Sequence, residues 1–279
     1  MGKLSVSLFA LGVAGCSSNN NGTADAGKTF MDAPPKVFMD APPKVYMDAP
    51  PVNYNFTCFG MTAPTTAADP ITIAGTTDEF SMNGGTALGG VAVATYKVGN
   101  ATAVDTKTSD ATLGTFTTGN ITTGAVPLDG YIKASIAAYR TTYLYPPNKI
   151  VANLTGVPVP LISDANFTQL NQFINQNDTT NGLLFVTVTD CANTPINGAT
   201  LTSKQGNADA GSVLDLGALT QQAALAGLYF VSNVPDGDTT IDASYNNMTF
   251  PSRVVTAHKK PSDANAEGTM TATILRPGP

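Results

Sequence analysis

The chain has 279 residues, of which 42% are hydrophobic and only 12% charged, with a formal net charge of −6, one histidine and no tryptophan. A net negative charge argues against a nucleic-acid-binding protein and against anionic membrane surfaces as partners, because both need basic surface patches. One histidine and three cysteines are too few for a zinc site.

The first sixteen residues have the pattern of a bacterial export signal. Lys3 supplies a basic start, and the apolar stretch at 4–13 is far shorter than the roughly 20 residues of a membrane-spanning helix. The sequence VAGC at 13–16 resembles the lipobox of bacterial lipoproteins, which implies a signal peptide at 1–15 and a lipid, such as palmitate, on Cys16. Ser17, in place of Asp, implies the outer membrane, at its periplasmic face or the cell surface. An ordinary secretory signal with an incidental cysteine is the alternative.

Residues 16–66 are predicted to form a disordered linker. Its centre repeats with a period of eight: MDAPPKVF at 31–38, MDAPPKVY at 39–46 and MDAPP at 47–51. An eight-residue unit is too short for a packed solenoid repeat, and its proline pair favours extended polyproline II. We interpret the segment as a stiff stalk. The alternative is a docking motif in which Phe30, Phe38 and Tyr46 anchor a partner.

A first β-sandwich is predicted at 67–162, where β-branched and aromatic residues alternate between Gly, Asn, Asp and Pro turns. Strands are expected at 71–75, 89–98, 113–119, 130–139 and 140–146, with a closing strand in 150–162. Pro158 and Pro160 restrict this last strand to a sheet margin, because proline cannot donate to a ladder.

A helical connector is predicted at 163–181. Ser163 is a suitable N-cap, and four apolar side chains fall on one helical face. These are Phe167, Leu170, Phe173 and Ile174.

A second β-sandwich is predicted at 182–279. Strands are expected at 182–190, 196–204, 227–234, 239–246, 251–259 and 269–277, and the loop at 205–226 has room for one or two helical turns. The predicted fold class is all-β, with two tandem small antiparallel β-sandwiches of transthyretin or immunoglobulin type joined by a short helix.

The second unit resembles a carboxypeptidase regulatory-like (transthyretin-type) domain. The resemblance rests on VTD at 188–190, PINGA at 195–199 and GLYFVSNVPDG at 227–237. The first unit matches more loosely, and the related B-type repeats of surface adhesins share the architecture. Such domains serve as spacers, scaffolds and binding modules, so the resemblance implies a fold and not an activity.

Cys58 and Cys191 remain once Cys16 carries a lipid. An even pair in an oxidising compartment is compatible with a disulfide that ties the end of the linker to the second domain. Two separate buried thiols are the alternative, because the sequence does not show how far apart the cysteines lie.

The sequence argues against an enzyme and implies no cofactor. The single histidine, His258, follows a predicted strand beside two lysines, and we interpret it as a solvated loop residue. A hydrolase triad needs a base beside a nucleophile, and the sequence holds no serine-hydrolase or nucleotide-binding motif.

Asp263, Asn265 and Glu267, followed by Gly268, match the front of a calcium loop. Position 12 of such a loop would be Ile274 in place of the bidentate glutamate. A polar hairpin is therefore the preferred interpretation.

Tyr139, Tyr143 and Tyr145 are the best candidates for a ligand platform, since tyrosines stack on sugars. Tyr143 and Tyr145 share one face of a predicted strand, with Tyr139 across a turn. A tyrosine ladder that completes a core or a domain interface is the preferred alternative.

The sequence thus predicts a lipid-anchored, non-enzymatic cell-envelope protein, structural or adhesive, that presents two β-sandwich modules on a stalk. A carbohydrate- or peptide-binding module of a surface complex is the alternative. The expected partners are the membrane, through the lipid, and an envelope or extracellular protein or glycan.

Overall fold

The computed structural model describes residues 52–81, 85–176, 181–222, 225–259 and 268–279. The chain from Pro51 to Pro279 forms one compact unit. The predictions for the signal peptide, Cys16 and the repeats lie outside the described residues. So do those for the calcium candidates Asp263, Asn265 and Glu267.

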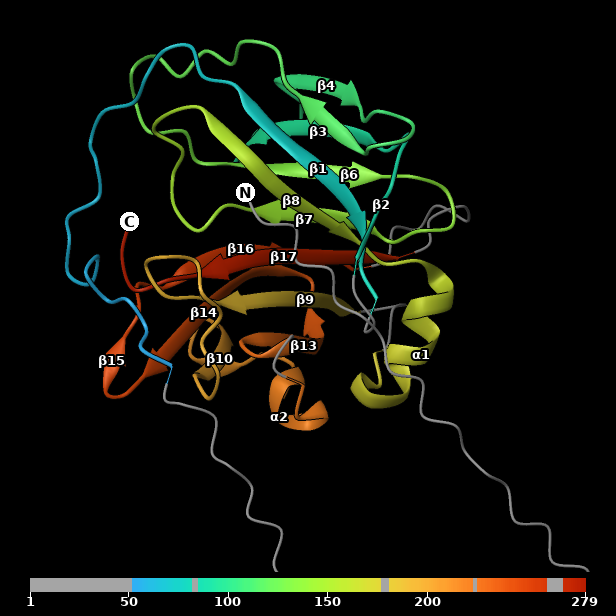
Figure 1. The fold of residues 1–279 in the computed structure, drawn as a ribbon, viewed down its shortest axis with the longest axis vertical. Coiled ribbons are helices and arrows are strands. Elements are labelled where there is room, and N and C mark those ends of the chain that lie inside the picture. Colours follow the sequence, from blue (N-terminus) through green and yellow to red (C-terminus); the bar gives the residue numbers. More distant parts are fainter. Residues whose placement is uncertain (1–51, 82–84, 177–180, 223–224, 260–267) are drawn as a thin grey trace, which may run out of the picture. The chain divides into compact units, whose positions relative to one another are not determined.

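The described residues form three β-sheets, which confirms the all-β class (Figure 1). The first sheet contains β1 (Ile73–Glu79), β2 (Thr86–Ala87), β5 (Thr115–Thr117) and β8 (Leu154–Leu161). The central sheet has the order β12 (Ser212–Asp215), β13 (Leu228–Pro235), β9 (Asn181–Val188), β17 (Thr269–Leu275), β7 (Thr141–Tyr145), β6 (Gly130–Ser135), β3 (Ala92–Lys97) and β4 (Asp105–Thr108). The third sheet contains β11 (Ala208–Asp209), β10 (Thr200–Gln205), β14 (Gly237–Tyr245), β15 (Met248–Thr249) and β16 (Arg253–Ala257).

The central sheet crosses the boundary expected between two sandwiches. Its strand β17, the last in the sequence, pairs in parallel with β7 from the first half and with β9 from the second. Ala272 of β17 lies opposite both Leu144 and Phe185. The arrangement therefore differs from two tandem antiparallel sandwiches, because one mixed sheet is shared by both halves.

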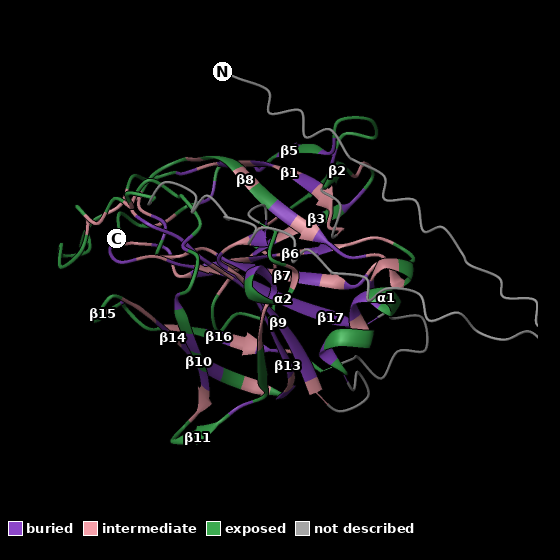
Figure 2. Ribbon diagram, turned by 60° about the horizontal axis from the view of Figure 1, so that its bottom comes forward, coloured by how far each residue is buried: buried purple, intermediate pink, exposed green. Residues whose placement is uncertain are grey.

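Two hydrophobic cores lie on opposite faces of the central sheet. In β9, Leu183 and Phe185 belong to the first core, whereas Leu184 and Val186 belong to the second. Both faces of this strand are therefore buried, as the purple colour of β9 and β17 shows in Figure 2. A strand buried on both faces has a continuous apolar sequence, and β9 reads NGLLFVTV.

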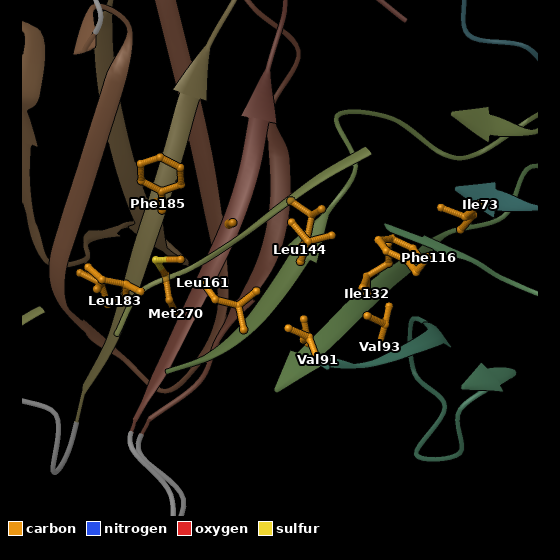
Figure 3. Close-up of a cluster of buried hydrophobic side chains, with 14 of the residues drawn as sticks. Ile73, Val91, Val93, Phe116, Ile132, Leu144, Leu161, Leu183, Phe185 and Met270 are labelled. Atoms are coloured by element: carbon orange, nitrogen blue, oxygen red, sulfur yellow. The ribbon is translucent and has the colours of Figure 1, made fainter. Parts of the chain in front are cut away.

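The first core mixes side chains from both halves of the sequence. It joins the first sheet to the central sheet, and Figure 3 labels these of its members: Ile73, Val91, Val93, Phe116, Ile132, Leu144, Leu161, Leu183, Phe185 and Met270. Because the shared core needs both halves, we expect neither half to bury its apolar face alone.

Helix α1 (Asp164–Ile174) confirms the predicted helix within the connector at 163–181. The Ser163 side chain accepts a hydrogen bond from the backbone N–H of Asn166, as an N-cap does. Of the predicted apolar face, Phe167, Leu170 and Ile174 are buried, but Phe173 is 52% exposed. A second short helix, α2 (Leu216–Thr220), lies in the loop where one or two helical turns were expected.

Strand β8 lies at a sheet margin, as its prolines predicted. Among the described strands it pairs only with β1, in parallel. Pro158 and Pro160 offer no N–H on the outer edge, which protects this edge from pairing with another chain.

Candidate functional site

The end of the predicted linker is fastened to the body of the protein. Residues 54–58, which we call the strap, alternate half-buried and exposed, with Tyr54, Phe56 and Cys58 on the inner face. The predicted linker therefore stops being a free segment before residue 66. The Y-x-F-x-C pattern is the sequence signal that identifies this inner face.

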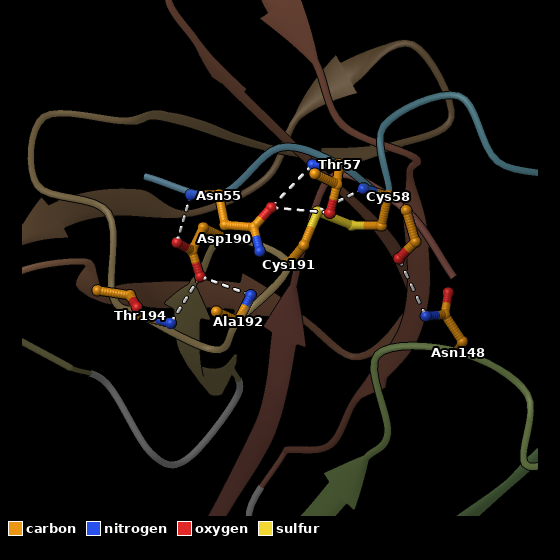
Figure 4. The surroundings of a disulfide bond; sticks show 9 residues. Asn55, Thr57, Cys58, Asn148, Asp190, Cys191, Ala192 and Thr194 are labelled. Carbon is orange, nitrogen blue, oxygen red and sulfur yellow. Dashed lines mark hydrogen bonds between the residues drawn. A yellow bond between two sulfur atoms is a disulfide. The ribbon is translucent and has the colours of Figure 1, made fainter. Parts of the chain in front are cut away.

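A disulfide joins Cys58 of the strap to Cys191 in the loop that follows β9 (Figure 4). The two Cα atoms are 5.7 Å apart, and the bond closes a sequence separation of 133 residues. Of the two alternatives for these cysteines, the structure has the bridge. It ties the end of the linker to the second half, as the sequence analysis anticipated for a bridged pair.

Asp190 organises the loop that receives the strap. One carboxylate oxygen accepts the backbone N–H of Asn55 at 2.7 Å, and the other accepts those of Ala192 and Thr194 at 2.8 Å each (Figure 4). The backbone N–H of Cys191 in turn donates to the Asn55 carbonyl at 2.8 Å. Asp190 is only 2% exposed, and hydrogen bonds to a buried carboxylate are among the strong ones.

Aromatic packing completes the attachment of the strap. We call the strap, Asp190 and the disulfide together the staple. The ring of Phe56 stacks on Tyr245 at 5.9 Å between centroids, and Tyr54 meets Tyr245 edge-on at 5.4 Å. The Tyr54 hydroxyl also accepts the backbone N–H of Asn197 at 3.0 Å. The staple thus combines a covalent bond, a buried carboxylate and an aromatic cluster against the second core.

The three tyrosines of the predicted platform do not lie together. Tyr143 and Tyr145 share the face of β7 that packs on the second core. Tyr139 packs on the first core, and its hydroxyl donates to Glu79 at 3.1 Å. Glu79 also accepts from Ser163 and Asn166 at the start of α1, so Tyr139 belongs to a helix-capping network.

Tyr143 and Tyr145 instead belong to an aromatic row across the central sheet. Tyr96 stacks on Tyr131 at 5.1 Å, and Tyr131 stacks on Tyr145 at 5.1 Å. Tyr143 lies 6.0 Å from Tyr131 and stacks on His258 at 3.8 Å. Burial raises the pKa of Tyr143 to about 12. This geometry agrees with the ladder interpretation, and sequence reasoning did not identify Tyr96 or Tyr131.

His258 is not the solvated residue that the sequence suggested. Its ring lies against Tyr143, its Nε2 is buried without a hydrogen-bond partner among the described residues, and burial lowers its pKa. The Thr269 hydroxyl donates to the carbonyl of His258, which brings the end of β16 to the start of β17. The prediction failed because it used only the neighbouring lysines, which are a local signal. His258 is covered by Tyr143, which lies far from it in the sequence, and by Thr269, at the start of the next strand.

Within the described part of the chain, no three His, Cys, Asp or Glu side chains are grouped closely enough to hold a metal ion. None of the helices there has the length and apolarity to cross a membrane.

No known protein family matches the chain, and no curated protein matches it. Among solved structures, the chain is similar to the Bacillus anthracis TIE protein, with 12% identity over 74% of this chain and a TM-score of 0.23. It spans only 34% of that protein's chain. It is also similar to the shaft pilin SpaA from Lactobacillus rhamnosus GG, with 11% identity over 77% of this chain and 99% of the pilin and a TM-score of 0.22. A further match is GBS52, the minor pilin of Streptococcus agalactiae, with 13% identity over 75% and 97% of the two chains and a TM-score of 0.23. TM-scores of this size establish neither a common fold nor a common function.

Proposed function

We propose that this protein is a lipid-anchored, non-enzymatic component of the bacterial cell envelope with a structural or adhesive role. Cys16 carries the lipid, the Pro-rich repeats form the stalk, and the three-sheet body is the part presented at the outer membrane or the cell surface. The observation that carries the proposal is the staple, where the end of the stalk meets the body through Cys58 and Cys191.

The staple suits a protein that is pulled by its N-terminus. Tension that arrives at Cys58 passes through the sulfur atoms to Cys191, so the chain between the two cysteines does not bear it. Cys191 follows β9, which lies between β13 and β17 in the central sheet. A disulfide also fits an oxidising compartment outside the cytoplasm.

The surroundings of His258 support the non-enzymatic part of the proposal. A general base must reach the proton that it removes, and the ring of His258 is stacked on Tyr143 with its Nε2 buried. A glycan- or peptide-binding module is the second candidate. It has less support, because the Tyr143 and Tyr145 rings are already engaged in stacking.

Lipid anchoring is tested by growing producing cells with an alkyne-tagged fatty acid. The wild-type protein should take up the tag and sediment with outer membranes, and a Cys16→Ala variant should do neither. Label on the Cys16→Ala variant, or none on the wild type, would contradict the anchor.

The staple is tested by single-molecule force spectroscopy between the two ends of the full chain. Under oxidising conditions, the segment between Cys58 and Cys191, a sequence separation of 133, should add nothing to the measured extension. Reduction should lengthen the unfolded chain by roughly 440–480 Å, at about 3.3–3.6 Å per residue. Equal extensions in both conditions would show that the bridge is absent from the folded protein.

The binding alternative is tested with a glycan array. Saturable binding that is lost when Tyr143 and Tyr145 are changed to alanine would favour that alternative over a purely structural role.

A further inference from the structure

A cavity of 490 Å³ lies between β8 and the central sheet, under the loop that follows β7. Its walls are mostly apolar and include Ile73, Leu144, Val157, Pro158 and Ile274. None of the described residues that line it carries a charge. Its volume is within the range of small-molecule sites, which are typically about 300–1,000 Å³.

A second cavity, of 230 Å³, adjoins the first. Four residues line both cavities, one each from β7, β8, β9 and β17: Leu144, Pro158, Thr187 and Ile274. Leu144 is labelled in Figure 3, near the middle of the first core. Because the two cavities share lining residues from four strands, they lie side by side beneath β8, and we infer that a chain-like molecule would occupy them better than a compact one.

Two residues that line the larger cavity have buried hydroxyl groups without a hydrogen-bond partner among the described residues, and a ligand would meet either hydroxyl after a rotation of the side chain. The two residues are Thr95 on β3, which is 1% exposed, and Thr189 after β9, which is 4% exposed. A buried hydroxyl without a partner costs free energy, and a polar group on a bound ligand would remove that cost.

The smaller cavity has acidic residues in its lining. Asp78 and Glu79 are both there, and Glu79 already accepts hydrogen bonds from Tyr139, Ser163 and Asn166. No described basic residue lines either cavity. A carboxylate or phosphate on the ligand would therefore be repelled and left unpaired.

We propose that these adjoining cavities bind an uncharged, single-chain lipid-like molecule, such as a straight-chain alcohol or a monoacyl ester. Its apolar chain fills the space beneath β8, and its hydroxyl or ester group meets Thr189. Thr189, Asn193 and Pro195 of the larger cavity belong to the loop that receives the strap, and the proposed site does not depend on a lipid on Cys16.

The test is calorimetric titration of 1-decanol into the full chain carrying Cys16→Ala, which carries no lipid on residue 16. We expect saturable binding of one molecule per chain, with decanoate at pH 7.5 bound at least about ten times more weakly. A short-chain diacyl phospholipid below its micelle-forming concentration should not displace 1-decanol, because its charged head group has no basic partner among the described lining residues. Displacement of 1-decanol by this phospholipid would overturn the assignment to an uncharged single-chain ligand.

Two variants and a control locate the site. Thr187 lines both cavities, so Thr187→Trp should abolish binding, whereas Val254→Trp adds a tryptophan at a side chain of β16 that is 52% exposed and should not. Thr189→Val keeps the shape and should weaken decanol binding by about 2- to 10-fold, the worth of one hydrogen bond.

Circular dichroism establishes that each variant is folded. If Thr187→Trp is not folded, the effect of Thr189→Val on decanol binding decides the test. The proposal is overturned if folded wild-type protein shows no saturable decanol binding. It is equally overturned if both tryptophan variants bind alike, or if decanoate binds as tightly as decanol.

Discussion

Removing the disulfide should lower the free energy of unfolding by about 2–5 kcal/mol. The upper figure follows from the chain entropy that a bridge of 133 residues removes from the unfolded state, about 17 cal/mol/K, or about 5 kcal/mol at 25 °C. The lower figure is typical of measured bridges. The perturbation is Cys58→Ser together with Cys191→Ser.

The reference protein should carry Cys16→Ser, so that neither chain can form a bridge through the third cysteine. Urea unfolding is followed by far-UV circular dichroism or by tyrosine fluorescence, since the chain has no tryptophan. Mass spectrometry first verifies that the reference contains the closed bridge. The variant should then unfold at a lower urea concentration with a similar slope.

A fall of less than about 0.5 kcal/mol, with the bridge verified, would refute this reasoning. It would mean that the hydrogen bonds to Asp190 and the Tyr54 and Phe56 rings hold the strap without the bridge. Limited proteolysis separates the two cases, because a released strap should be cut before the body unfolds.

Three further predictions address the fold and its titrating groups. Gly75→Ala should lower the free energy of unfolding, measured in urea, by about 1–3 kcal/mol, because a Cβ there would meet the Val157 carbonyl and lie 2.9 Å from the Phe116 ring. Gly119→Ala is the matched control and should be near neutral, because a Cβ there would lie 3.4 Å from its nearest neighbour, the Asp105 carboxylate. The pKa of His258 is lowered in the folded protein, so the unfolded chain takes up more protons, and the free energy of unfolding should fall as the pH drops below about 6.5. His258→Phe should reduce this fall when urea unfolding is measured across the same pH range. The fragment 67–162 should show no cooperative unfolding, because it lacks β17 and the second-half side chains of the first core; a sharp transition would support independent sandwiches instead.

Alkaline conditions give a fifth prediction with the opposite slope. The pKa of Tyr143 is about 12 when folded, against an ordinary value of 10. Its contribution to stability is therefore complete below pH 10 and is lost as the pH rises through 12. Tyr143→Phe should reduce this loss in urea unfolding at pH 9–12, whereas an unchanged profile would show that the hydroxyl is not buried.

The staple could be predicted only in part. Alternating Tyr54, Phe56 and Cys58 indicate one inward face, and an even cysteine pair is compatible with either a bridge or two separate thiols. Asp190 stood at the end of an expected strand, in a motif that was interpreted only as part of the resemblance to a carboxypeptidase regulatory-like domain. Its role depends on Asn55, which lies 135 residues away in the sequence, and no local pattern names such a partner.

The tyrosine row could not be predicted from the sequence for the same reason. Tyr96 and Tyr131 are direct partners in the ladder between β3 and β6, yet each has an ordinary strand context. Only their pairing makes them neighbours of Tyr145. His258 likewise is half-buried because its ring packs on Tyr143 of the central sheet, which no neighbour in sequence indicates.

The sequence by itself determined the positions of most strands, the start of α1 and the edge position of β8. These depend on alternation, capping and proline chemistry, which act over a few residues. The tertiary structure alone decided that the C-terminal strand β17 lies between β7 and β9, so that the two halves share one sheet and one core. The physical reason is that a strand offers the same hydrogen bonds to every neighbour, and the choice among neighbours is made by burial over the whole chain.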